Sequence, residues 1–124
     1  MSDRKTTKER GASGEATAAA YVGGLGWTIE ARNVQFRCGE LDIVAWDGDQ
    51  LVFVEVRSTW RRGSSRVADT VTFPKQRRLT RAAGLYMAKM GYDRVSARFD
   101  VIGVDRGRSV VVDHARGAFD AVAF

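Results

Sequence analysis

Two acidic residues, Asp42 and Glu55, interrupt apolar, β-branched segments that flank the dipeptide Asp47-Gly48. Asp-Gly between two such segments is a strong signal for a β-hairpin. A two-residue loop at 48–49 sets Asp42 directly opposite Glu55, whereas a loop at 47–48 makes them diagonal neighbours. In either register the two carboxylates share one face of the hairpin, because side chains alternate along a strand. Like charges this close are destabilising, so the pair requires a compensating metal ion or arginine.

A metal ion at this position would have oxygen ligands. Carboxylates and water are the usual ligands of Mg²⁺, and Glu15 and the backbone carbonyl of Val56 are candidates to complete the set with the hairpin acids. Such an ion polarises a phosphoryl oxygen and lowers the pKa of bound water, as phosphodiester hydrolysis requires. Arg57, on the same face as Glu55, would stabilise the charge that develops on the phosphate.

A plainer interpretation needs no ligand. Asp42 and Glu55 would pair with Arg57 and Arg37 at a sheet edge, and such surface pairs contribute only about 0–1 kcal/mol to stability. Glu15 would then be an ordinary exposed glutamate of a helix.

Basic residues gather in the middle of a chain whose net charge is +5. Between residues 57 and 81 only Asp69 is acidic, and such clustering favours binding of a polyanion through phosphate neutralisation. A solvated, arginine-rich surface is the alternative. Besides Arg57, the predicted nucleic-acid-binding residues are Arg61, Arg62, Arg66, Lys75, Arg77, Arg78 and Arg81.

The periodicity predicts two helices and five strands that would position these groups. The first helix follows a mobile tail (1–6), begins at the capping box Thr6–Glu9 or nearer Ala12, and ends near Leu25. The second has Thr72 as its cap and Pro74 in its first turn, and ends at Met90 before Gly91. Its predicted buried residues are Leu79, Ala82, Ala83, Tyr86 and Met90. The predicted strands are 27–34, 41–46, 51–56, 97–104 and 109–113, with a mobile basic loop at 58–71.

This order predicts one α/β domain over residues 1–124, with a mixed sheet flanked by helices. A crossover through the second helix would make the third and fourth strands parallel. Asp100 is expected on the polar side of its strand in a salt bridge, His114 as a packed or surface residue, and Phe119 against the core. The single cysteine, Cys38, and the lack of an apolar run of about 20 residues favour a cytoplasmic protein without a membrane partner.

Several segments together resemble the YraN-like (UPF0102-type) family of small bacterial proteins. The matching pieces cover roughly residues 11–104 and are Gly14-Glu15, Arg32-Asn33, Gly39–Ala45, Val52–Arg57, Lys75 and Arg98–Val101. That family is similar to the PD-(D/E)XK nuclease superfamily and to archaeal Holliday-junction resolvases. The resemblance implies a restriction-endonuclease-like αβββαβ core, with Asp42 and Glu55 as metal-binding acids and Glu15 as the helical glutamate. Arg57 stands where the superfamily motif has lysine, and Lys75 is a candidate to replace that lysine.

Three hypotheses follow from these residues. The first is a Mg²⁺- or Mn²⁺-dependent endonuclease acting on DNA, with branched DNA as a candidate substrate and a homodimer as the expected state of a junction-cutting enzyme. The second is a nucleic-acid-binding or interaction module that keeps the fold without hydrolysis, because arginine cannot exchange a proton as lysine can. The third is a protein-binding role for the basic face of the second helix.

Overall fold

The elements follow the predicted order. The computed structural model describes residues 7–59 and 66–121. The elements are α1 (Thr7–Gly24), β1 (Thr28–Phe36), β2 (Gly39–Asp47), β3 (Gln50–Thr59), the 3-10 helix η1 (Val67–Thr70), α2 (Phe73–Met90), β4 (Ala97–Asp105) and β5 (Val110–Phe119). This arrangement confirms the predicted α/β class and the αβββαβ core. Thr6 and its capping box, and the tail at 1–6, lie outside the described residues.

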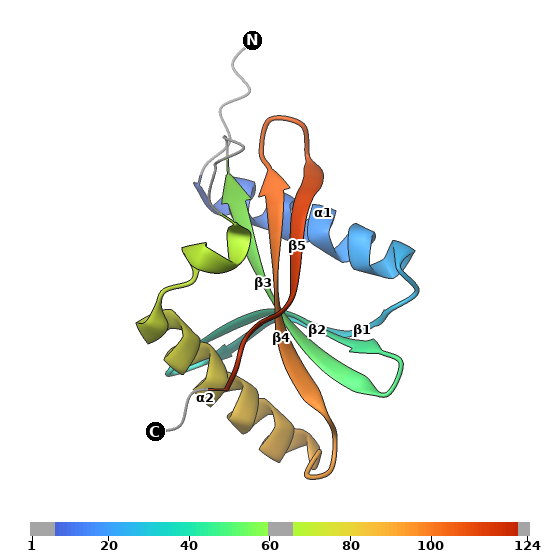
Figure 1. The fold of residues 1–124 in the computed structure, drawn as a ribbon, viewed down its shortest axis with the longest axis vertical. Coiled ribbons are helices and arrows are strands. Elements are labelled where there is room, and N and C mark those ends of the chain that lie inside the picture. Colours follow the sequence, from blue (N-terminus) through green and yellow to red (C-terminus); the bar gives the residue numbers. More distant parts are fainter. Residues whose placement is uncertain (1–6, 60–65, 122–124) are drawn as a thin grey trace.

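A five-stranded sheet runs in the order β1-β2-β3-β4-β5, with β3 at its centre (Figure 1). The pair β3–β4 is parallel, as predicted, and the other neighbours are antiparallel. Asp47 pairs with Gln50, so the hairpin has the two-residue loop at 48–49, and Gly48 supplies its positive φ of 60°. This is the register that directs Asp42 toward Glu55, although the paired ladder ends just before them, at Ile43 and Val54.

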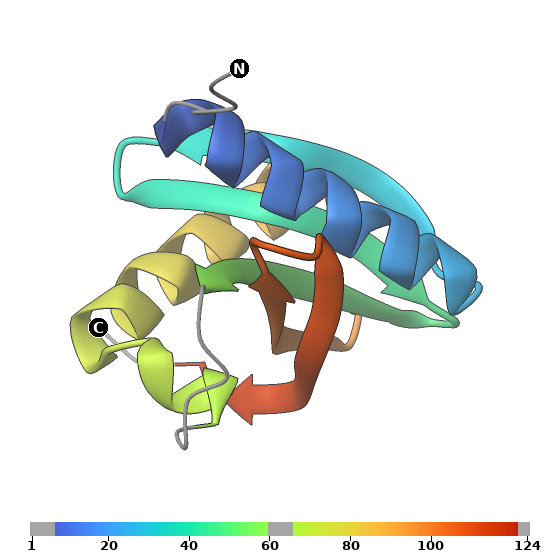
Figure 2. The same cartoon turned by 90° about the horizontal axis from the view of Figure 1, so that it is seen from above.

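The helices cover opposite faces of the sheet (Figure 2). Val54 packs in the cluster that contains Val22 of α1, whereas Phe53 packs in the cluster that contains Tyr86 of α2. Since side chains alternate along β3, Glu55 lies on the α2 side.

The ends of α2 are those predicted from its capping residues. The Thr72 hydroxyl accepts the backbone N–H of Lys75 at 3.4 Å, and Gly91 ends the helix with φ 75°. Met90, predicted to be buried, is 42% exposed. At the C-terminal end of α2, Met87 instead of Met90 lies on the buried face of the helix, where it is partly buried against the α2-side cluster. No helix in the described ranges has the length and apolarity needed to cross a membrane.

The predicted loop at 58–71 was wrong at both ends. β3 continues through Thr59, and η1 begins at Val67. Val67 and Val71 are buried in the α2-side cluster, which explains why this segment is ordered against the core despite its lack of periodicity. Residues 60–65 lie outside the described residues.

Asp100 is fully buried, which corrects its expected place on a polar side. The expected salt bridge is present, with Arg98 Nε 2.9 Å from the carboxylate. His114 Nε2 lies 2.9 Å from the other oxygen, and the backbone N–H of Gly117 donates at 3.0 Å. Burial raises the pKa of Asp100, but these hydrogen bonds outweigh it and the pKa is lowered. His114 is a packed residue, as predicted, and its Nδ1 lies 3.0 Å from the Tyr21 hydroxyl of α1.

The N-terminal half of α1 approaches β3 closely. A Cβ atom added at Gly14 would lie 2.3 Å from Ser58 Oγ and 3.7 Å from Ser58 Cβ. Glycine at this position therefore lets the helix lie against β3, and the following residue, Glu15, is brought to the edge of the sheet.

Gly14→Ala is predicted to have opposite effects in two backgrounds. Alanine gains roughly 0.5–1 kcal/mol over glycine in a helix interior. In the wild type the new methyl group meets Ser58 Oγ, so this gain is offset or reversed. In a Ser58→Ala background the obstructing atom is gone, and the substitution stabilises the protein. Urea unfolding of the four proteins of this double-mutant cycle measures the difference, and equal effects in both backgrounds would contradict the close approach.

Candidate functional site

The candidate site lies where the β2–β3 ladder ends. The Asp42 carboxylate accepts the backbone N–H of Val56 at 2.8 Å. Leu41 and Val44 both pack in the α2-side cluster, which strict alternation along a strand does not allow. β2 is therefore irregular at Asp42, and the carboxylate lies at an opening between β2 and β3 that both faces of the sheet can reach.

Two of the three predicted acids, Glu15 and Asp42, come together here with oxygen atoms within 4.8 Å, and the third, Glu55, lies close enough to Asp42 for its charge to raise the pKa of Glu55. Glu15 comes from α1, and Glu55 is 6% exposed on the α2 side. Asp42 interacts electrostatically with both Glu15 and Glu55, because its charge raises the pKa of each of them. The structure thus brings Asp42 next to residues that lie 27 and 13 positions away in the sequence.

Two further side chains belong to the cluster and were missed by the sequence reasoning. Oxygen atoms of Glu40, Glu15 and Asp42 all lie within 4.8 Å of one another. With its amide nitrogen facing the acids, Asn33 donates to both oxygens of Glu15 at 2.7 Å and to Glu40 Oε1 at 3.1 Å. The signal for Glu40 was available, because it precedes Asp42 by two residues and alternation gives them the same face. Asn33, with φ 54°, is a strand residue in the left-handed region, which sequence alone did not indicate.

Burial and mutual repulsion shift the acids toward their protonated forms. Burial, followed by the charge of Asp42, raises the pKa of Glu55 to about 7. The same two causes raise the pKa of Glu15 to about 7. Burial also raises the pKa of Asp42, although the Val56 N–H opposes the shift. Such shifts show that the folded chain holds more negative groups here than its own cations neutralise.

The cluster fits a hard divalent cation. Its donors are all carboxylate oxygens, which suit Mg²⁺ or Mn²⁺. Glu55 Oε2 is buried and has no hydrogen-bond partner among the described residues. A buried carboxylate oxygen without a donor is costly, and a metal ion would satisfy it. The Val56 carbonyl stays a predicted ligand.

Two cations face the acids. Lys75 of α2 places its Nζ 3.8 Å from Glu55 Oε1. The charge of Arg57, on the same face of β3, acts with that of Lys75 to oppose the raised pKa of Glu55. Lys75 therefore reaches Glu55 from α2, whereas Arg57 lies on β3 with Glu55.

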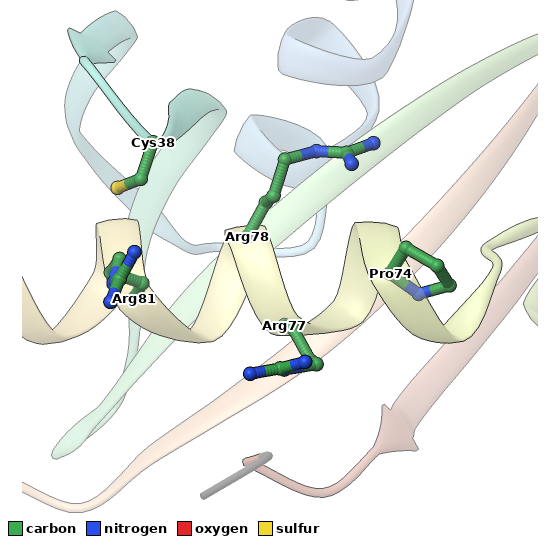
Figure 3. A pocket seen from close by; sticks show the side chains of 5 residues that line it. All are labelled: Cys38, Pro74, Arg77, Arg78 and Arg81. Carbon is green, nitrogen blue, oxygen red and sulfur yellow. The ribbon is translucent and has the colours of Figure 1, made fainter. Parts of the chain in front are cut away.

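Three other predicted basic residues surround a hollow on the outer side of α2 (Figure 3). Its volume is about 190 Å³, and it is lined by Arg77, Arg78 and Arg81 together with Pro74 and Cys38. Arg66 is exposed at the start of η1. Arg61 and Arg62 lie outside the described residues.

Comparisons with known proteins point to one family. The family model described as "Uncharacterised protein family UPF0102" matches residues 14–104. A UPF0102 protein of Symbiobacterium thermophilum is 46% identical over 97 residues, covering 78% of this chain and 82% of the relative. One from Chlorobium chlorochromatii is 39% identical over 126 residues, covering 96% and 97%. One from Syntrophotalea carbinolica is 46% identical over 110 residues, covering 86% and 88%.

The metal-free protein is predicted to lose stability as the pH rises. Glu55 has a pKa near 7 when folded, against an ordinary value of 4.5, so the folded state binds more protons between these values. The stability that Glu55 contributes is therefore fully present below about pH 4.5 and is lost, by roughly 1–3 kcal/mol, between about pH 5 and pH 8. Urea unfolding in EDTA measures this loss. Glu55→Gln should make this loss smaller and leave the share that comes from Glu15, whereas Asp49→Asn, at the exposed hairpin turn, should leave the loss unchanged.

Mg²⁺ or Mn²⁺ is predicted to restore stability at about pH 8. An ion that binds only the folded state stabilises it by about 2.7 kcal/mol at a concentration 100 times its Kd. Thermal unfolding with metal and with excess EDTA measures the effect, which Asp42→Asn should abolish. An equal rise in Tm for wild type and Asp42→Asn would show that the ion binds elsewhere.

Proposed function

The chain belongs to the uncharacterised protein family UPF0102, and for this member we propose a metal-dependent nuclease that hydrolyses phosphodiester bonds in DNA. The observation that carries this proposal is the cluster of Glu15, Glu40 and Asp42, whose oxygen atoms lie within 4.8 Å of one another. Asp42 also interacts electrostatically with the buried Glu55, which has the Lys75 amine 3.8 Å away. A buried cluster of acids with raised pKa values is unfavourable for stability alone, and such clusters are frequent at functional sites.

The site offers the parts that phosphodiester hydrolysis needs. In that reaction water forms a bond to phosphorus and the bond to a sugar oxygen breaks, while one proton leaves the water and one reaches the leaving oxygen. A divalent ion held by Asp42, Glu15, Glu40 and Glu55 would polarise the phosphate and lower the pKa of its bound water. Asp42 is fixed for this role because its Oδ2 is held by the Val56 N–H at 2.8 Å.

In this proposal Lys75 and Arg57 together perform the two roles of the lysine in the superfamily motif. The Lys75 amine, 3.8 Å from Glu55, is positioned to orient the attacking water and to exchange a proton. Arg57 stays charged, and it offsets the negative charge that grows on the phosphate in the transition state.

DNA is the proposed partner because of the charges around the acids. The exposed side chains of Arg77, Arg78 and Arg81 follow Lys75 along α2 and can neutralise phosphates on either side of a cleaved bond. A homodimer would be required for symmetric cutting of a branched junction. Light scattering tests this version separately, and a monomer would limit the proposal to unilateral cleavage.

A second candidate function is nucleic-acid binding without hydrolysis. Arg57 favours it, because arginine cannot serve in proton transfer at the position where the superfamily motif has lysine. This candidate requires that Lys75 does not compensate. It predicts salt-sensitive DNA binding that persists in EDTA and in Glu55→Ala.

Cleavage of a labelled four-way junction and of a matching linear duplex tests the proposal. We expect cutting with Mg²⁺ or Mn²⁺ and none in EDTA. Glu55→Ala and Lys75→Met should each lower the rate by about 100-fold or more, because both remove a group that acts in the transition state. Lys89→Met, the same change in the last turn of α2, is the matched control and should cleave as the wild type does.

The variant Arg57→Lys separates the two candidates. A silent wild type with an active Arg57→Lys variant would mean a complete site that lacks one proton-transfer group. Silence from both, with DNA still bound, would refute hydrolysis and leave the binding module.

A further inference from the structure

The outer side of α2 carries features that the acid cluster does not explain. Phe73, the first residue of the helix, is 61% exposed. The arginine-lined hollow of Arg77, Arg78 and Arg81 begins one turn later. An exposed phenylalanine forgoes the favourable free energy of burying its ring, and this one lies beside a cationic hollow.

Phe73 and the hollow lie on the same part of the helix. Phe73 and Arg77 are four residues apart and therefore neighbours on one face of α2. Pro74, which follows Phe73 directly, lines the hollow itself. Figure 3 shows Arg78 projecting from α2 toward the side on which Cys38 of the β1–β2 connection lies, Arg77 projecting to the other side, and Arg81 further along the helix.

Residues that line the hollow are also close in the chain to residues of the acid cluster. Lys75, one residue after Pro74, contacts Glu55. Arg78 packs against Gly39, where an added Cβ would lie 3.5 Å from Arg78 Cβ, and the next residue is Glu40 of the cluster. The helix rises about 1.5 Å per residue, so Arg77 to Arg81 extend the positive surface to about 9 Å beyond Lys75 along the helix axis.

We propose that Phe73 and the arginine-lined hollow form a subsite for an unpaired nucleic-acid strand, with a base stacked on Phe73 and neighbouring phosphates held by Arg77 and Arg78. This inference rests on the proposed function for the acid cluster and names its substrate class. An aromatic ring beside cationic side chains is the combination that binds single strands, because every unpaired base offers a face for stacking. A duplex hides those faces within its own stack, so the ring would gain nothing from it.

Fluorescence anisotropy in EDTA tests the subsite without requiring cleavage. The probes are a labelled 12-nucleotide oligothymidylate and a labelled hairpin duplex. Phe73→Ala should weaken binding of the oligothymidylate by about tenfold, the size of one lost stacking contact, and leave duplex binding unchanged. Phe73→Trp should retain affinity and Phe73→Leu should lose it, which separates stacking from apolar contact. Phe73 is exposed, so none of these variants removes a core contact.

The salt dependence of oligothymidylate binding distinguishes phosphate contacts made by Arg77 and Arg78 from stacking on Phe73. Arg77→Ala and Arg78→Ala should each reduce the slope of log Kd against log salt concentration by about 0.7, the value for one phosphate on a single strand. Phe73→Ala should leave that slope unchanged. Lys89→Ala and Arg108→Ala remove the same charge at exposed positions in the last turn of α2 and in the β4–β5 turn, and should have little effect.

Each outcome decides the proposal. Loss of single-strand affinity in Phe73→Ala, with Arg77→Ala and Arg78→Ala lowering the slope more than the controls, supports the subsite even if the protein never cleaves DNA. Equal losses for duplex and single strand in Phe73→Ala, unchanged affinity in that variant, or control-like arginine variants would overturn it. Absence of oligothymidylate binding at low salt would overturn it as well, whatever the cleavage assay gives.

Discussion

The arrangement of the candidate site depends on the hydrogen bond from the Val56 N–H to the Asp42 carboxylate. The regular pairing between β2 and β3 ends at Ile43 and Val54. Beyond it, the backbone N–H of Val56 on β3 donates to the side-chain carboxylate of Asp42 at 2.8 Å. The strands therefore part without leaving that N–H unpaired. The opening admits Glu15 from one face of the sheet and Glu55 from the other, which a continuous ladder would keep apart.

Bringing these acids together is electrostatically unfavourable, as the raised pKa values of Glu15 and Glu55 indicate. Burial and mutual repulsion raise the pKa values of Glu15 and Glu55 to about 7, and the nearby charges of Lys75 and Arg57 do not cancel the effect on Glu55. The rest of the fold resists the repulsion. Two apolar clusters on the two faces of β3 hold the strands that carry Asp42 and Glu55, and their burial does not depend on the charges of the site.

Two other acidic groups, the half-buried Glu30 and the buried Asp100, show the opposite balance. Glu30 of β1 accepts hydrogen bonds from Tyr86 of α2 and from Trp46, and although burial raises its pKa these bonds lower it overall. Asp100 is likewise fully satisfied, by Arg98, His114 and Gly117. Against these two, Glu55 is exceptional, because one of its buried oxygens has no donor among the described residues. The contrast separates carboxylates that tie elements together from those that form the candidate site.

The sequence by itself determined the elements and the two hairpin acids. Asp47-Gly48, Thr72, Pro74 and Gly91 act through local backbone geometry, so the hairpin and the limits of α2 could be predicted from single residues. Only the tertiary structure decided which groups meet at Asp42. The role of Asn33 depends on its left-handed backbone and on the approach of Glu15 from α1, and the contact of Lys75 with Glu55 depends on how α2 packs on the sheet. These features follow from contacts between residues distant in the chain. The same reason explains the errors at 58–71 and at Asp100: burial there is set by packing between elements, and no local pattern records it.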